Sequence, residues 1–169
     1  MKYLLILLLF VSGLGYAQED NHYFKLNEHN ELIWQKTYTI KDSSNYVNSL
    51  LKREKTSNIK SEYGQILGEF NNIQLKGSKY PVYSKRPTKG SLIIEFKENR
   101  IRVTVVNIVF QSLKGNVLAK EKVIPATLSK YALNNKNEIK KGKSVTSMLQ
   151  GLDEKLSLIF KPTKDDNDW

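Results

Sequence analysis

The clearest pattern in this chain of 169 residues is an alternation of apolar and polar positions near its middle. Leu92, Ile94 and Phe96 alternate with Ser91, Ile93 and Glu95, a polar turn follows over residues 97–100, and a second alternating run begins directly after it. A period of two is typical of strands with one buried face, so the pattern predicts a β-hairpin. The phase of the second run slips at Val105–Asn107, which predicts a bulge or sharp bend there.

Other parts of the chain have readable periods as well, whereas residues 112–143 show only a weak strand pattern over 117–125 and a helical turn over 126–133. The order of elements favours an α+β fold: an antiparallel sheet, a short helix after strand 1 and a long C-terminal helix packed on one face. The predicted elements are a strand over 32–40, a helix over 44–54 that starts at Asp42-Ser43-Ser44, one or two strands within 65–75, and a helix capped by Ser144 that ends before Pro162.

The N-terminus has the pattern of an export signal. Met1-Lys2 is followed by a short apolar run, and Gly15 and Ala17 stand at the −3 and −1 positions of a signal-peptidase site. The run is shorter than the roughly 20 residues that span a bilayer. We therefore expect cleavage near Ala17 and a periplasmic or extracellular protein.

The expected organisation of the rest is simple. Residues 18–30 are predicted to be a flexible lead-in, residues 31–160 a single domain, and residues 161–169 a disordered acidic tail. No second apolar run predicts a transmembrane anchor. The chain has no cysteine, which excludes disulfides, thiol nucleophiles, cysteine metal sites and lipid attachment through an N-terminal cysteine.

The charge of the chain is strongly basic, with 27 Lys and Arg against 17 Asp and Glu. Outside the cytoplasm such a charge could serve anionic lipid headgroups, acidic glycans or an acidic protein partner rather than nucleic acid, but a solvated lysine-rich surface is the favoured interpretation. The candidate basic surface consists of one cluster interleaved with tyrosines and a second without aromatic partners: Lys79, Lys85, Arg86 and Lys89, then Lys140, Lys141 and Lys143.

Motifs that carry chemistry are weak. Gly142-Lys143-Ser144 imitates the end of a P-loop, but Asn137 stands where that motif needs a glycine, so a basic turn and a helix cap are favoured. His22 and His29 precede the first strand, beside Glu28, without the rigid surroundings that a metal site or a catalytic relay needs.

Carboxylates that could form an acid–base pair are interpreted as ordinary solvated charges, two on strands and two on the last helix: Glu69, Glu95, Asp153 and Glu154. No catalytic residue, metal site or cofactor is predicted, and the chain is not expected to be an enzyme.

Four segments resemble one known family in their order along the chain and in their amino-acid sequence: Leu32-Ile33-Trp34-Gln35-Lys36; Asp42-Ser43-Ser44 with Tyr46, Leu50 and Leu51; Gly64-Gln65-Ile66-Leu67-Gly68; and Arg100 to Ile108. Together they cover about residues 31–111. The chain resembles small secreted bacterial domains of unknown function with a TBP-like fold. This resemblance implies a fold (a strand, a helix, an antiparallel sheet and a final helix) and no activity, substrate or catalytic residue. DNA binding does not travel with the fold name.

The leading functional hypothesis is a non-catalytic exported binding module with a small or lipidic ligand in a groove between the sheet and the long helix. The alternative is an envelope scaffold or protein-interaction domain whose basic loops contact an acidic partner. A hydrolase comes third. The candidate groove residues are Trp34, Phe70, Phe96, Leu149 and Leu156.

Overall fold

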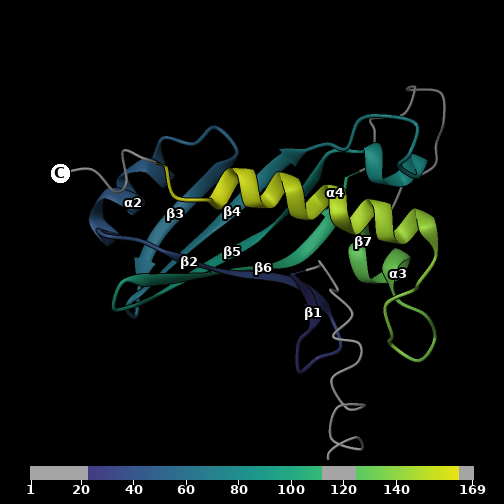
Figure 1. The fold of residues 1–169 in the computed structure, drawn as a ribbon, viewed down its shortest axis with the longest axis horizontal. Coiled ribbons are helices and arrows are strands. Elements are labelled where there is room, and N and C mark those ends of the chain that lie inside the picture. Colours follow the sequence, from purple (N-terminus) through teal and green to yellow (C-terminus); the bar gives the residue numbers. More distant parts are fainter. Residues whose placement is uncertain (1–22, 112–124, 164–169) are drawn as a thin grey trace, which may run out of the picture.

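The computed structural model describes residues 23–111 and 125–163, which form an antiparallel sheet with helices on one face (Figure 1). The strand order is β1-β2-β6-β5-β4-β3, and β7 pairs with the far end of β6. The elements are β1 (Phe24–Leu26), β2 (Leu32–Thr39), α2 (Ser43–Leu51), β3 (Thr56–Glu62), β4 (Gln65–Ile73), the 3-10 helix η1 (Val82–Lys85), β5 (Thr88–Lys97), β6 (Arg100–Phe110), β7 (Ala126–Thr127), α3 (Leu128–Ala132) and α4 (Lys143–Phe160).

The predicted hairpin is the β5–β6 pair, and the predicted bulge is present. Between the pairs Ser91–Val106 and Lys89–Val109, two residues of β6 oppose Gly90 alone. Asn107 takes a left-handed φ of 53° at this point, a conformation that asparagine tolerates better than most residues. The extra residue restores the phase, so the apolar residues after it return to the buried face of the sheet.

The helix α2 begins where the sequence predicts. The carboxylate of Asp42 accepts hydrogen bonds from the backbone N–H groups of Ser44 and Asn45, at 2.7 and 3.3 Å. Tyr46 is fully buried, and its hydroxyl donates to the carbonyl of Phe160 at 2.9 Å. This bond fixes α2 against the C-terminal end of α4.

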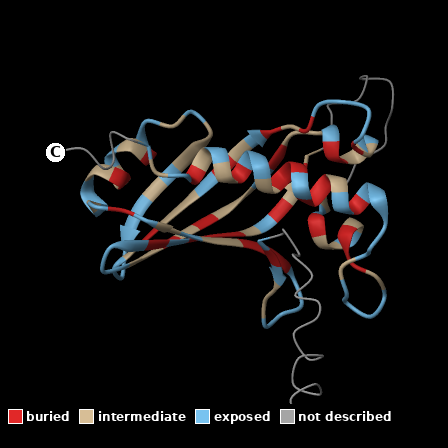
Figure 2. Ribbon diagram, in the orientation of Figure 1, coloured by how far each residue is buried: buried red, intermediate tan, exposed pale blue. Residues whose placement is uncertain are grey.

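The long helix α4 buries one continuous stripe against the sheet, visible as the red segments of its ribbon in Figure 2. The expectation that Ser144 caps it is wrong. The N-cap is Gly142, whose carbonyl accepts from Val145 and Thr146, so Ser144 lies inside the first turn. Mid-helix, Gly151 packs against Tyr80: a Cβ there would lie 2.6 Å from the tyrosine ring.

Three strands were not foreseen: β1, β3 and β7. β1 lies inside the predicted flexible lead-in, so that expectation is wrong for residues 24–26; three residues are too few to show a period. β3 is a polar edge strand without an apolar alternation. The predicted helical turn over 126–133 is confirmed for Leu128–Ala132, which form α3, and is wrong for Ala126–Thr127, which form β7. The predicted signal peptide, almost all of the possible strand over 117–125 and most of the tail lie outside the described residues.

Candidate functional site

The space beneath α4, where the sequence suggested a ligand groove, is filled by side chains. Trp34 and Leu149 are 0% exposed, and Phe70 and Leu156 are 1% exposed. The rings of Trp34 and Phe160 lie 6.0 Å apart at a tilt of 39°. These four groove candidates are therefore core residues. The apolar spacing in the sequence showed which way their side chains face, but it carried no information on how tightly α4 packs against the sheet.

Phe96, the fifth groove candidate, lies at an opening. It lines a cavity of about 370 Å³ between α2 and the turn that joins β3 to β4. Val47 and Ile66 complete its apolar surface, and the rest of the lining is polar and uncharged. An open groove between the sheet and a helix thus exists beside α2 rather than beneath α4.

A second open groove lies between the last turns of α4 and the end of β4, with a volume of about 340 Å³. We call it the basic groove. Its apolar surface comes from Ile73, Leu158 and Ile159, and the cations around it are Lys55, Lys76 and Lys155. Asn72 and Gln74 complete the lining, which includes no carboxylate.

Leu158 is the most unusual residue of the basic groove. It is 76% exposed, although leucines elsewhere on α4 are buried. Neighbouring Ile159 is held in place because the guanidinium of Arg53 donates to its carbonyl oxygen. The groove therefore offers apolar surface and positive charge side by side on a fixed frame.

The two predicted basic clusters gather at the other end of α4, near η1 and the start of the helix (Figure 1). The rings of Tyr83 in η1 and Tyr131 in α3 stack at 3.9 Å and join η1 to the helix that precedes the second cluster. Lys140 donates to the carbonyl of Tyr131 at 3.0 Å. Burial raises the pKa of Tyr83.

Most cations of these clusters are exposed, and only Arg86 is partly covered: its Nε atom is buried and has no hydrogen-bond partner among the described residues. Val82 lies between two of them and is 77% exposed. The exposed cations are Lys79, Lys85, Lys89, Lys140, Lys141 and Lys143.

A polar chain crosses the interface between β2 and α4. The indole of Trp34 donates to Asp153 at 2.7 Å, and the hydroxyl of Ser157 donates to the same carboxylate at 3.3 Å. Lys36 donates to Ser157 at 2.9 Å and lies 3.8 Å from the ring centre of Tyr23. Asp153 is therefore a structural acceptor, and its interpretation as a solvated charge is wrong.

The hydrogen bond from Lys36 to Ser157 joins an amine to a hydroxyl, but neither residue lines the three cavities described in this section. Beside it, the buried hydroxyl of Tyr38 has no hydrogen-bond partner among the described residues. Burial raises the pKa of Tyr38 to about 12, and the nearby Ser157 hydroxyl offsets a part of that rise. The hydrogen bonds that link Lys36, Ser157, Asp153 and Trp34 therefore position α4 on the sheet.

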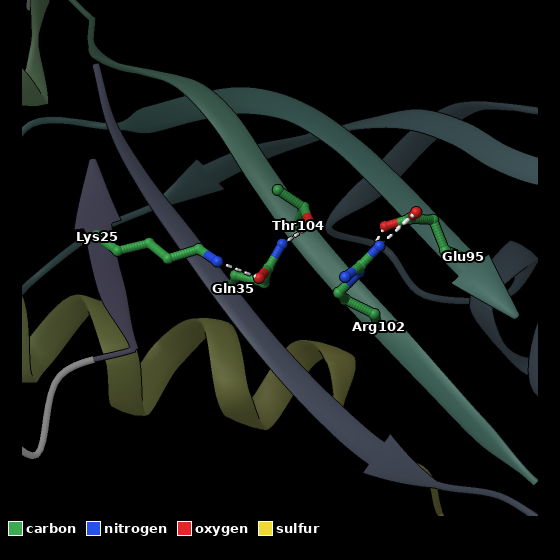
Figure 3. A network of polar contacts seen from close by, with 5 residues as sticks. All are labelled: Lys25, Gln35, Glu95, Arg102 and Thr104. Carbon is green, nitrogen blue, oxygen red and sulfur yellow. Dashed lines mark hydrogen bonds and ion pairs between the residues drawn. The ribbon is translucent and has the colours of Figure 1, made fainter. Parts of the chain in front are cut away.

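The opposite face of the sheet carries a separate polar network, shown in Figure 3. Glu95 accepts two hydrogen bonds of 2.7 Å from Arg102, and these bonds hold the pKa of its carboxyl below the usual range. Gln35 accepts from Lys25 and donates to Thr104. Glu95, interpreted from the sequence as a solvated charge, is partly exposed but is paired with Arg102.

His29 and Glu28 line a third cavity of about 390 Å³ at the turn between β1 and β2. Within residues 23–111 and 125–163, no group of three or more His, Cys, Asp or Glu side chains is placed to hold a metal ion. No helix in those ranges is long and apolar enough to cross a membrane.

Sequence reasoning missed the basic groove because its residues come from separate segments. Lys55 follows α2, Lys76 follows β4, and Lys155 lies on α4. One signal was available: Leu158 stands off the apolar stripe that runs through Leu152 and Leu156. An apolar residue on the polar side of an amphipathic helix is a candidate contact with a ligand or partner.

Comparison with known proteins gives a fold. A scan against family models and a search of curated proteins found no match. Among solved structures, a TBP-like protein from Parabacteroides distasonis ATCC 8503 matches with a TM-score of 0.50 and 14% identity, over 79% of this chain and 93% of that one. A DUF4468 family protein from Bacteroides ovatus ATCC 8483 matches with a TM-score of 0.44 and 14% identity, over 90% and 99% of the two chains. The TBP-like protein confirms the fold suggested by the sequence: this chain is an α+β domain with a TBP-like fold.

Proposed function

We propose that the protein is an exported, non-catalytic binding module whose basic groove takes an anionic amphiphile, such as a fatty acid or a comparable lipidic acid. The observation that carries the proposal is the 76% exposure of Leu158 in a groove that three lysines line. An apolar tail would cover Leu158 and Ile159, and an acidic head would meet the ammonium groups.

The size and charge of the groove support this ligand class. Ligand cavities typically measure roughly 300–1,000 Å³, and the basic groove has about 340 Å³. Its lining includes lysines and no carboxylate, although Glu54 and Glu154 are exposed close by in the sequence. A neutral apolar ligand would place no negative charge beside the lysines, and a small inorganic anion would leave Leu158 exposed to solvent.

The test is calorimetric titration of the purified protein with dodecanoate below its critical micelle concentration. Replacing Lys55, Lys76 and Lys155 together by Gln should weaken binding about tenfold, because each exposed ion pair contributes about 0.2–1 kcal/mol. The matched control replaces Lys79, Lys85 and Lys89 by Gln, which removes the same charge from the other end of α4 and should leave affinity unchanged.

The apolar part of the site has its own matched pair. Leu158→Ser should weaken dodecanoate binding about tenfold, while Val82→Ser should not, although Val82 is 77% exposed and Leu158 is 76% exposed. Equal affinities for all variants, or no saturable binding of dodecanoate, would contradict the proposal. Vesicles of anionic lipid in a parallel titration separate a free acid from a headgroup in a bilayer as the source of the ligand.

A second function is favoured by the exposure of Val82 between Lys79 and Lys85: an envelope scaffold that contacts an acidic partner through the basic loops. The same charge variants test it in cells. If the Lys79, Lys85 and Lys89 triple variant loses envelope association, and the basic-groove variant keeps it, the scaffold function is the better account.

A further inference from the structure

The groove between α2 and the β3–β4 turn differs in chemistry from the basic groove, and we call it the neutral groove. It has a volume of about 370 Å³, and its lining includes no charged side chain. Its polar groups are hydroxyls and amides, and its apolar surface comes from Val47, Ile66 and Phe96. An ion would find no counter-charge there, so an uncharged ligand fits this surface better.

The polar side chains of the neutral groove are not used by the fold. Ser43 and Asn48 come from α2, Ser61 ends near the tip of β3, and Gln65 begins β4. None of these four side chains has a hydrogen-bond partner among the described residues. Amides and hydroxyls both donate and accept, so the groove presents paired donors and acceptors to a ligand.

Aromatic surface lies on the floor and beside the groove. Phe96 lines it from β5, half-buried against the core. Tyr63 precedes Gly64 in the tight β3–β4 turn, is 100% exposed and has a left-handed φ of 51°. Asparagine or glycine would occupy this turn position with less strain and no exposed ring. The fold therefore gives no reason for a tyrosine here.

We propose that the neutral groove binds an uncharged oligosaccharide. A sugar ring has an apolar face that stacks on an aromatic side chain, and equatorial hydroxyls that amide and hydroxyl groups can pair. Phe96 and Tyr63 supply the aromatic contacts, and Asn48 and Gln65 supply the amides. The site is independent of the basic groove, since the two share no lining residue.

The experiment is an NMR titration of the full, ¹⁵N-labelled protein with three neutral hexasaccharides, of α-linked glucose, of β-linked glucose and of β-linked N-acetylglucosamine. We expect at least one of them to give saturable shifts confined to α2, the β3–β4 turn and β5. Dodecanoate should leave these resonances unchanged.

Three variants make the result specific. Tyr63→Asn, which also relieves the turn, and Gln65→Ala should each weaken sugar binding at least fivefold. Asn45→Ala changes the same residue type as Asn48 on α2 but lies outside the groove lining, so its affinity should equal that of the parent protein. Parent-like thermal unfolding of Tyr63→Asn shows that a lost contact, and not a lost fold, explains the result.

Either of two outcomes overturns the proposal. The first is that no hexasaccharide gives saturable shifts, or that Tyr63→Asn and Gln65→Ala bind like the parent. The second is that an uncharged hexapeptide of serine, threonine and alanine shifts these resonances while the sugars do not, which would assign the groove to a peptide.

Discussion

The two ends of α4 carry similar cations on different supports. At its C-terminal end, Phe160 is fully buried, Tyr46 bonds its carbonyl, and the lysines surround an open apolar groove. At its N-terminal end, the lysines come from the region around η1 and from the segment that leads into α4, and the partly exposed stack of Tyr83 and Tyr131 connects the two. Positive charge alone does not distinguish these ends. The difference is the open apolar groove, which the C-terminal cations line.

The largest expected effect on stability compares the aromatic packing at the two ends of α4. Phe160→Ala should lower the free energy of unfolding by about 3–5 kcal/mol, because it leaves a cavity beside Trp34. Tyr83→Ala should cost less, about 1–2 kcal/mol, because its ring is partly solvated in the folded state. Urea unfolding measures both, and equal losses would contradict the contrast.

In the middle of α4, replacing a glycine by alanine is predicted to lower stability, the opposite of what helix propensity alone would give. Gly151→Ala would stabilise a typical helix interior, but here the new Cβ would meet Tyr80, so we expect a loss of about 1–3 kcal/mol. The double variant with Tyr80→Leu should recover stability, since the smaller side chain leaves room. A stabilised Gly151→Ala protein would show that Tyr80 does not require the glycine.

The interface between β2 and α4 contains a group whose removal should help. Tyr38→Phe removes a buried hydroxyl without a described partner and should stabilise the protein by about 1 kcal/mol near pH 8. The folded-state pKa of Tyr38 is raised to about 12, so its neutral form contributes stability that is complete below the ordinary pKa near 10 and is lost as pH rises through 12. The advantage of Tyr38→Phe should therefore grow between pH 10 and 12, measured by urea unfolding; a loss of stability at pH 8 would contradict it.

The smallest effect lies on the open face of the sheet, away from both ends. Glu95→Gln should cost about 0.2–1 kcal/mol at pH 7, because the pair with Arg102 is partly solvated. The folded-state pKa of Glu95 is lowered, so its contribution is present above the ordinary pKa near 4.3 and disappears as pH falls through the lowered value. Thermal unfolding of both proteins at pH 7 and at pH 3 checks this, and an undiminished difference at pH 3 would contradict it.

The sequence predicted the helices and strands that have a clear apolar period. It did not predict very short elements, or sites whose residues come together only in the folded structure. The β5–β6 pair, its bulge and α4 follow from apolar spacing, and α2 follows from apolar spacing and its cap at Asp42. β1 has three residues, and β3 lacks an apolar alternation. The candidate sites were predicted less well than the fold. Trp34 faces α4 as expected but is fully buried in the core. Lys55, Lys76 and Leu158 are far apart in the sequence and line one groove only in the folded structure.

The most direct test of the central claim locates the amphiphile on the protein. A spin-labelled fatty acid, with the nitroxide near the end of its tail, is added to ¹⁵N-labelled protein, and the loss of amide signal is measured. The account predicts that signals of Ile73, Leu158 and Ile159 are broadened, and that those of Val82 and Tyr131 are not. Broadening centred on Val82, or spread evenly over the surface, would contradict it.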